Sequence, residues 1–192
     1  GEIVRRVSGK SLGTFFREQV AEPLGADFWI GAPEQVEARV APMSAYKANQ
    51  SDMLGEFLQA VAGDLQSISS LSLLNTGGFE ANARAWHGAE IGGAGGISNA
   101  RALARIYAPL ACGGSLDGVK LVDADQLTRM SEVAVATQRD ATLLIPTRFS
   151  LGYMKSMDNR RRAFGDKDSA ILSSAAFGHV GAGGSIGFAD PV

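Results

Sequence analysis

The segment FGHVGAGGSIGFADP, residues 177–191, places His179 among five glycines. A histidine can hold or move a proton near neutral pH, and a glycine lets a substrate lie against the bare backbone of a strand. Alternate residues of a strand face the same side, so His179 and Gly181 would share one face. A neighbouring backbone N–H could then donate to the oxyanion of an acyl-transfer reaction. The pattern therefore indicates either one wall of an acyl-transfer site or a plain glycine-rich hairpin whose histidine bonds a loop.

A second candidate is the pair Ser44 and Lys47, which has the spacing Ser-x-x-Lys. One helical turn would bring the lysine amine to the serine hydroxyl and activate it as a nucleophile. The spacing is common by chance in a chain with many serines. Ser44 also follows Ala41-Pro42-Met43 in a weakly patterned region, whereas a catalytic serine should open a strongly apolar helix. We rank this pair well below the His179 segment as a source of nucleophilic chemistry.

Cofactor and metal chemistry find little support in the motifs. The glycine-rich stretch 92–96 precedes a helix, but no apolar strand precedes it and no Lys-Ser/Thr follows it, so a structural loop is the better interpretation. The two histidines, His87 and His179, are far apart in the sequence, and no histidine pair at metal-ligand spacing accompanies them. We therefore expect neither a metal nor a cofactor. The single cysteine, Cys112, is expected to be a buried structural thiol.

Composition favours a packed domain without a special partner. The chain has 192 residues, of which 45% are hydrophobic and 20% are charged, and its net charge is −2. The short basic run 159–162 lies near several aspartates, which favours a solvated loop over a nucleic-acid surface. No apolar run reaches the roughly 20 residues of a membrane helix, so no membrane span is expected.

Helical patterns dominate the first part of the chain and strand patterns the last part. We predict helices that begin at Ser11, Ser51, Ser98 or Asn99, and Asp123, with irregular segments at 28–50 and 75–96. Strands are predicted at 149–154, around His179 and at 186–188. This order predicts an α+β fold. Residues 1–192 would form part of a single domain, with a helical and rim region at about 1–145 and sheet strands at about 146–192.

Three segments together resemble the serine β-lactamase and penicillin-binding-protein-like superfamily, and most closely its esterase branch near the class C β-lactamases. The segment GEIVRRVSGKSLGTFFREQVAEPLGA is similar to the stretch after the family's tyrosine motif. The segment GGAGGISNARALARIYAPLACGG is similar to its glycine-rich loop and following helix, and FGHVGAGGSIGFADP resembles its third motif. The resemblance implies a β-lactamase/transpeptidase-like fold, of which this chain would be an internal part.

The resemblance also implies roles at matching positions. His179-Val180-Gly181 stands in the place of the family's Lys-Thr-Gly, so His179 would orient the substrate or the tyrosine. The N–H of Ala182 would be an oxyanion donor, and Trp86, His87 and Gly183 would belong to the substrate rim. The family's lysine is a permanent cation that attracts a substrate carboxylate, and a histidine is not. The replacement therefore favours neutral esters as substrates over acidic ones.

The implied function is that of a serine hydrolase acting on carboxylic esters through an acyl-enzyme. Its nucleophilic serine, its lysine and its tyrosine would lie upstream of Gly1, so the chain alone would be inactive. Two alternatives stay open: a β-lactamase or DD-peptidase acting on amides, and a non-catalytic binding relative. The expected partner is a small-molecule ester. The oligomeric state is not indicated, and a cytoplasmic location is only slightly favoured.

Overall fold

A computed structural model describes residues 1–44, 47, 55–75, 80–162, 169–181 and 183–191. The chain divides into two compact units, each made of segments that are distant in the sequence. The first contains residues 1–45 and 79–123, and the second contains residues 46–78 and 124–192. These boundaries differ from the division near residue 145 that the patterns suggested. The prediction of one domain over residues 1–192 stays a prediction.

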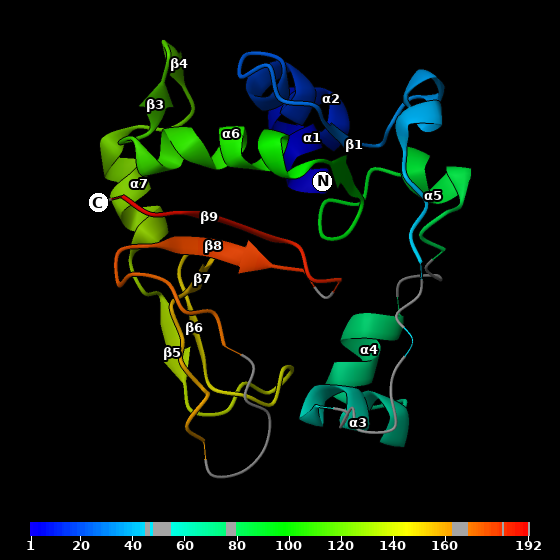
Figure 1. The fold of residues 1–192 in the computed structure, drawn as a ribbon, viewed down its shortest axis with the longest axis vertical. Coiled ribbons are helices and arrows are strands. Elements are labelled where there is room, and N and C mark those ends of the chain that lie inside the picture. Colours follow the sequence, from blue (N-terminus) through cyan, green and yellow to red (C-terminus); the bar gives the residue numbers. More distant parts are fainter. Residues whose placement is uncertain (45–46, 48–54, 76–79, 163–168, 182, 192) are drawn as a thin grey trace. The chain divides into compact units, whose positions relative to one another are not determined.

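The first unit begins with short helices. They are α1 (Glu2–Ser8), α2 (Leu12–Phe16) and the π-helix η1 (Arg17–Ala21), followed by the 3-10 helix η2 (Glu34–Arg39) and α5 (Arg84–Gly88). Ser11 caps α2 by accepting a hydrogen bond from the Thr14 N–H, as its position in the sequence predicted. Figure 1 shows α1 and α2 next to each other near the N-terminus.

A carboxylate distant in the sequence completes the N-terminal end of α2. Glu90 accepts hydrogen bonds from the Ser11 hydroxyl at 2.7 Å and from the Gly13 N–H at 2.9 Å. A negative group is favourable there because the first N–H groups of a helix have no partners within the helix. Gly13 is needed at this point, since an added Cβ would lie 2.1 Å from the Ile30 carbonyl oxygen. The contact joins residues that are 77 positions apart.

Two antiparallel ribbons and a longer helix complete the first unit. Strand β1 (Phe28–Ile30) pairs with β2 (Gly96–Ser98), and β3 (Ser115–Leu116) pairs with β4 (Val119–Lys120). The prediction that 28–50 and 75–96 are irregular was therefore wrong for β1, η2, α5 and the start of β2. Three-residue strands are too short for alternation to reveal them. Helix α6 (Ala100–Ala111) is capped by Asn99, as predicted, and the β3–β4 ribbon lies at its C-terminal end (Figure 1).

Cys112 is exposed, so the prediction of a buried thiol was wrong. Cys112 is the C-cap residue of α6, and the last buried residue of that helix is Leu110. The apolar pattern of the helix predicts burial up to Cys112. The helix ends there, because Gly113 and Gly114 have the positive φ angles of a turn.

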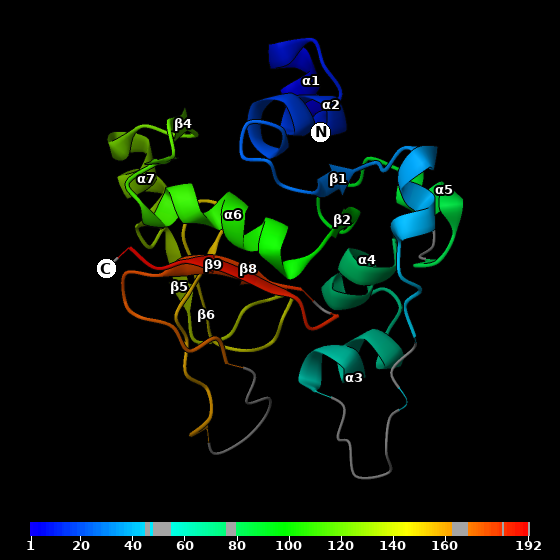
Figure 2. The same ribbon diagram turned by 45° about the horizontal axis from the view of Figure 1, so that its top comes forward.

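The second unit combines helices with an antiparallel sheet. Its helices are α3 (Glu56–Gly63), α4 (Ile68–Leu74) and α7 (Ala124–Ser131). Helix α3 ends at Gly63, as predicted, and the predicted cap Ser51 lies outside the described residues. Helix α4, which the patterns did not indicate, packs against α3 and is capped by Ser67 (Figure 2).

The sheet contains five antiparallel strands among the described residues, in the order β5-β6-β7-β8-β9. They are β5 (Val135–Thr137), β6 (Thr147–Phe149), β7 (Met154–Lys155), β8 (Phe177–Val180) and β9 (Ile186–Ala189). The prediction of one strand at 149–154 was wrong, because a turn at Ser150–Tyr153 divides it into β6 and β7. Gly152 makes this turn at φ +85°, and the Ser150 N–H donates to the Tyr153 carbonyl at 2.8 Å. The combination of helices with antiparallel strands confirms the α+β class.

Candidate active site

The glycine-rich segment forms the β8–β9 hairpin. Phe177 pairs with Ala189, Gly178 with Phe188, His179 with Gly187, and Val180 with Ile186. Gly178 is required by this pairing, because an added Cβ would lie 2.2 Å from the Gly187 carbonyl oxygen. Both strands that were predicted around His179 are thus confirmed, and the hairpin places His179 near the tip.

His179 is exposed and its ring is partly oriented by the backbone. Its Nδ1 lies 2.7 Å from the carbonyl oxygen of Val180. A carbonyl can only accept, so Nδ1 carries a proton, and in the neutral ring Nε2 then has a free electron pair. The ring centroid lies 6.4 Å from that of Phe149. This arrangement leaves Nε2 able to accept a proton or a hydrogen bond from a bound molecule.

The hairpin tip begins at Gly181. Its N–H donates to the Ser185 carbonyl at 2.8 Å, and its own carbonyl accepts from the Gly184 N–H at 3.0 Å. An added Cβ at Gly181 would lie 2.4 Å from the Ser185 hydroxyl oxygen, so a side chain there would displace Ser185. Because the turn uses the Gly181 N–H, an oxyanion donor would have to be another amide. Ala182, the expected donor, lies outside the described residues, and Gly183 is exposed.

Three side chains pack together at the start of β8: Phe177 of β8, Tyr153 of the turn before β7, and Lys155 of β7. Phe177 is fully buried, and the ring of Tyr153 packs against it edge-on with centroids 5.2 Å apart. The Lys155 ammonium lies 5.8 Å from the Phe177 ring centroid and donates to the Ala175 carbonyl at 2.9 Å. Burial and, to a smaller extent, the charge of Arg148 lower the pKa of Lys155, while Asp190 raises it. The sequence patterns did not predict that Tyr153 and Lys155 contact Phe177. A lysine directly after the apolar Met154 was a weak sign that this lysine is buried.

Tyr153 leads to a prediction about alkaline stability. Burial raises the pKa of its hydroxyl above the ordinary value near 10. As pH rises, the unfolded chain therefore loses this proton first. The contribution to stability is complete below the ordinary pKa and is lost as pH rises through the raised one. Phenylalanine has no hydroxyl to ionise, so we expect Tyr153→Phe to remove this part of the loss of stability at high pH. The free energy of unfolding measured as a function of pH checks this. Identical pH profiles for the two proteins would contradict the prediction.

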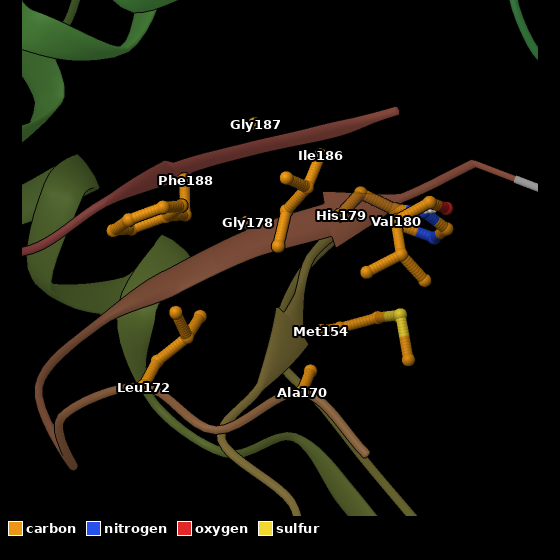
Figure 3. A pocket seen from close by; sticks show the side chains of 9 residues that line it. All are labelled: Met154, Ala170, Leu172, Gly178, His179, Val180, Ile186, Gly187 and Phe188. Carbon is orange, nitrogen blue, oxygen red and sulfur yellow. Dashed lines mark hydrogen bonds between the residues drawn. The ribbon is translucent and has the colours of Figure 1, made fainter. Parts of the chain in front are cut away.

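A shallow apolar hollow lies on the sheet beside the hairpin. The residues around it come from β7, β8, β9 and the segment before β8, as Figure 3 shows; they are Met154, Ala170, Leu172, Gly178, His179, Val180, Ile186, Gly187 and Phe188. Val180, Ile186 and Phe188 are exposed large apolar side chains. Among the described residues that line it, the hollow therefore offers mainly apolar contact, and His179 contributes the one ionisable side chain.

The other predicted site residues lie elsewhere in the chain. Trp86 and His87 are in α5 of the first unit, where Trp86 is half-buried and His87 is buried. Ser44 and Lys47 are exposed and lie in coil, so neither has the helical setting that a Ser-x-x-Lys pair needs. Within the described ranges, no group of three or more His, Cys, Asp or Glu side chains is placed to hold a metal ion. No helix among those residues is long and apolar enough to cross a membrane.

Comparison with known families decides the relationship. The sequence model of the beta-lactamase family matches residues 1–192. The chain belongs to the beta-lactamase family. This membership confirms the resemblance inferred from the motifs, and the mixed fold of helices and antiparallel sheet agrees with it.

Individual relatives place the chain more closely. It is 32% identical over 196 residues to the esterase/beta-lactamase LipL of Mycobacterium tuberculosis, a match that covers 98% of this chain and 42% of that protein. It is 33% identical to a penicillin-binding protein homolog from Caulobacter crescentus, with a TM-score of 0.75 over all of this chain and 46% of that one. A family VIII carboxylesterase is 32% identical, with a TM-score of 0.74, 100% of this chain covered and 46% of that one. The chain thus spans less than half the length of these relatives.

Proposed function

We propose that the full-length protein carrying this chain is a serine hydrolase that cleaves carboxylic esters through an acyl-enzyme. The nucleophilic serine, the lysine and the tyrosine would be supplied by residues upstream of Gly1. His179 would orient the substrate or the tyrosine, and the Ala182 N–H would donate to the oxyanion. Trp86 and Gly183 are proposed rim contacts. Membership of the beta-lactamase family and the esterase relatives support this assignment.

The observation that carries the proposal is the exposed His179 at the end of β8. The family motif has a lysine at this position, whose permanent charge attracts a carboxylate. His179 instead presents Nε2 while Nδ1 is held by the Val180 carbonyl. An imidazole lacks the permanent charge of a lysine, so it suits an uncharged ester better than an acidic amide. The described residues that line the apolar hollow include no lysine or arginine.

Substitution at His179 tests the role of this side chain. We expect His179→Ala in the full-length protein to lower kcat/KM for a short-chain nitrophenyl ester by about a hundredfold, because misplacement of reacting groups has effects of this size. Leu151→Ala, at an exposed position in the turn between β6 and β7 and outside the lining of the hollow, should change kcat/KM little. His179→Lys should shift preference from the ester toward the carboxylate-bearing β-lactam nitrocefin. An unchanged ester rate in a folded His179→Ala protein would contradict the assigned role.

Beta-lactam hydrolysis is the second candidate, because the name of the relative LipL includes both activities. The ratio of nitrocefin to nitrophenyl ester turnover in the unmodified protein separates the two. A non-catalytic binding relative is the third. Intact mass after treatment with a fluorophosphonate serine probe distinguishes it, since an enzyme gains a single adduct and a binding relative gains none.

A further inference from the structure

Lys155 is a buried lysine at the base of the hairpin that carries His179. It is the last residue of β7, it pairs with Phe177 of β8, and only 5% of its surface is exposed. Its ammonium donates to the Ala175 carbonyl at 2.9 Å and lies 5.8 Å from the Phe177 ring centroid. Lys155 therefore holds the segment that leads into β8, and His179 follows two residues after Phe177.

Ser173 and Asp190 close the same end of the hairpin. The Ser173 hydroxyl donates to Oδ1 of Asp190, the residue after β9, and its oxygen accepts from the Ala176 N–H at 3.1 Å. Burial lowers the pKa of Lys155 and the charge of Asp190 raises it, so the ammonium and this carboxylate attract each other. The entry to β8 is thus tied to β7 on one side and to the end of β9 on the other, in the strand order that Figure 1 shows.

The position of the His179 ring follows the position of its strand. The ring is bonded through Nδ1 to the carbonyl of Val180, which is the next residue of β8. The partner of His179 across β9 is Gly187, which has no side chain to hold the ring. A shift of β8 relative to β7 therefore carries the imidazole with it. Lys155 acts at the opposite end of this four-residue strand.

Stability alone does not explain a lysine at position 155. Burial disfavours the charged ammonium and lowers its pKa, whereas methionine fills a similar space without this desolvation. Ala175 is exposed, so water can donate to its carbonyl in place of the ammonium. The advantage of lysine over methionine is therefore a directed hydrogen bond that fixes one point of the chain just before β8.

We propose that Lys155 is a positioning residue for ester hydrolysis: by holding the Ala175 carbonyl, it sets the course of β8 and hence the place at which the His179 imidazole meets the substrate. This inference rests on the proposed function for the role of His179. Because Lys155 is buried, its effect on the reaction passes through His179 rather than through a contact of its own.

A double-mutant cycle in the full-length protein tests this dependence on His179. Lys155→Met should lower kcat/KM for a short-chain nitrophenyl ester about tenfold, because small displacements of a group at the reacting centre have large effects on rate. In a His179→Ala background the same change should lower kcat/KM by less than about twofold, because the group that it positions is gone. Lys120→Met removes an exposed lysine from β4 and should leave kcat/KM unchanged. An equal loss in both backgrounds, or no loss in either, would overturn the proposal.

Thermal unfolding separates positioning from a general loss of structure. Lys155→Met should keep the melting temperature within about 3 °C of the unmodified protein, since no packed volume is lost. Lys155→Gln, whose donor is one bond closer to the backbone, is the second variant if Lys155→Met does not fold, and the same dependence on His179 is expected. A much lower melting temperature, with an activity loss that is the same with and without His179, would assign Lys155 a structural role only and overturn the proposal.

Nuclear magnetic resonance of the full-length protein labelled with ¹⁵N-histidine tests the positioning without ester turnover. In the neutral ring of His179, the proton should lie on Nδ1 in the unmodified protein and be shared between the two nitrogens in Lys155→Met. The signals of His87 in the first unit should not change, and His179→Ala distinguishes the two rings. Unchanged His179 signals in Lys155→Met would overturn the inference. If the unmodified protein does not hydrolyse the ester, the proposed function fails, while these signals still decide whether Lys155 positions the ring.

Discussion

Replacing Phe177 with alanine is expected to lower the free energy of unfolding by about 3–5 kcal/mol, the range for fully buried aromatic side chains. Phe177 is 0% exposed at the start of β8, between the ring of Tyr153 and the Lys155 ammonium. Its removal leaves a cavity that the paired strands cannot close, because Phe177 is held opposite Ala189. Chemical denaturation of the full-length protein measures the change.

The matched control for Phe177 is Leu151, in the turn that joins β6 to β7. Leu151 is 59% exposed, so Leu151→Ala should change the free energy of unfolding by less than about 0.5 kcal/mol. The two variants remove side chains of similar kind from adjacent parts of one sheet. Equal losses in both would show that burial in the β7–β8 region does not stabilise the hairpin.

The second large effect on stability is expected at Gly114, in the turn between α6 and β3. Gly114 has φ +100°, and an added Cβ would lie 2.3 Å from the Val122 carbonyl oxygen. Its carbonyl also accepts from the Leu121 N–H at 2.9 Å, so the backbone cannot move away without losing that bond. Backbone strain and overpacking together should make Gly114→Ala destabilising by about 3 kcal/mol.

The variant Gly113→Ala separates the effect of backbone strain from that of overpacking. It has φ +76°, but an added Cβ there has no atom within 4 Å. Gly113→Ala should therefore show backbone strain alone, at about 1 kcal/mol in the free energy of unfolding. A loss for Gly114→Ala no larger than that for Gly113→Ala would show that Val122 moves to accommodate the new atom.

Local signals predicted much of the fold. Ser11 and Asn99 were identified as caps because a short polar side chain before an apolar repeat satisfies the first N–H groups of a helix within the same turn. The hairpin around His179 was predicted because its strands are joined by a short turn, so both partners lie within one segment. The order of helices and strands gave the α+β class, and three motifs together indicated the family.

Patterns failed where partners are far apart in the sequence. The β1–β2 ribbon pairs residues about 70 positions apart, and three residues per strand leave no alternation to read. The turn at Gly152 was missed because an apolar alternation continues through it, although its backbone reverses.

The sequence by itself determined the fold class, the family and the hairpin that carries His179, because each depends on residue types within short segments. Only the tertiary structure decided how distant side chains meet. It placed Glu90 at the start of α2, put Tyr153 and Lys155 beside Phe177, and enclosed His87 between Glu37 and Ala81. The physical reason is that a hydrogen bond or an ion pair forms between atoms that are close in space, and separation along the chain does not encode that distance.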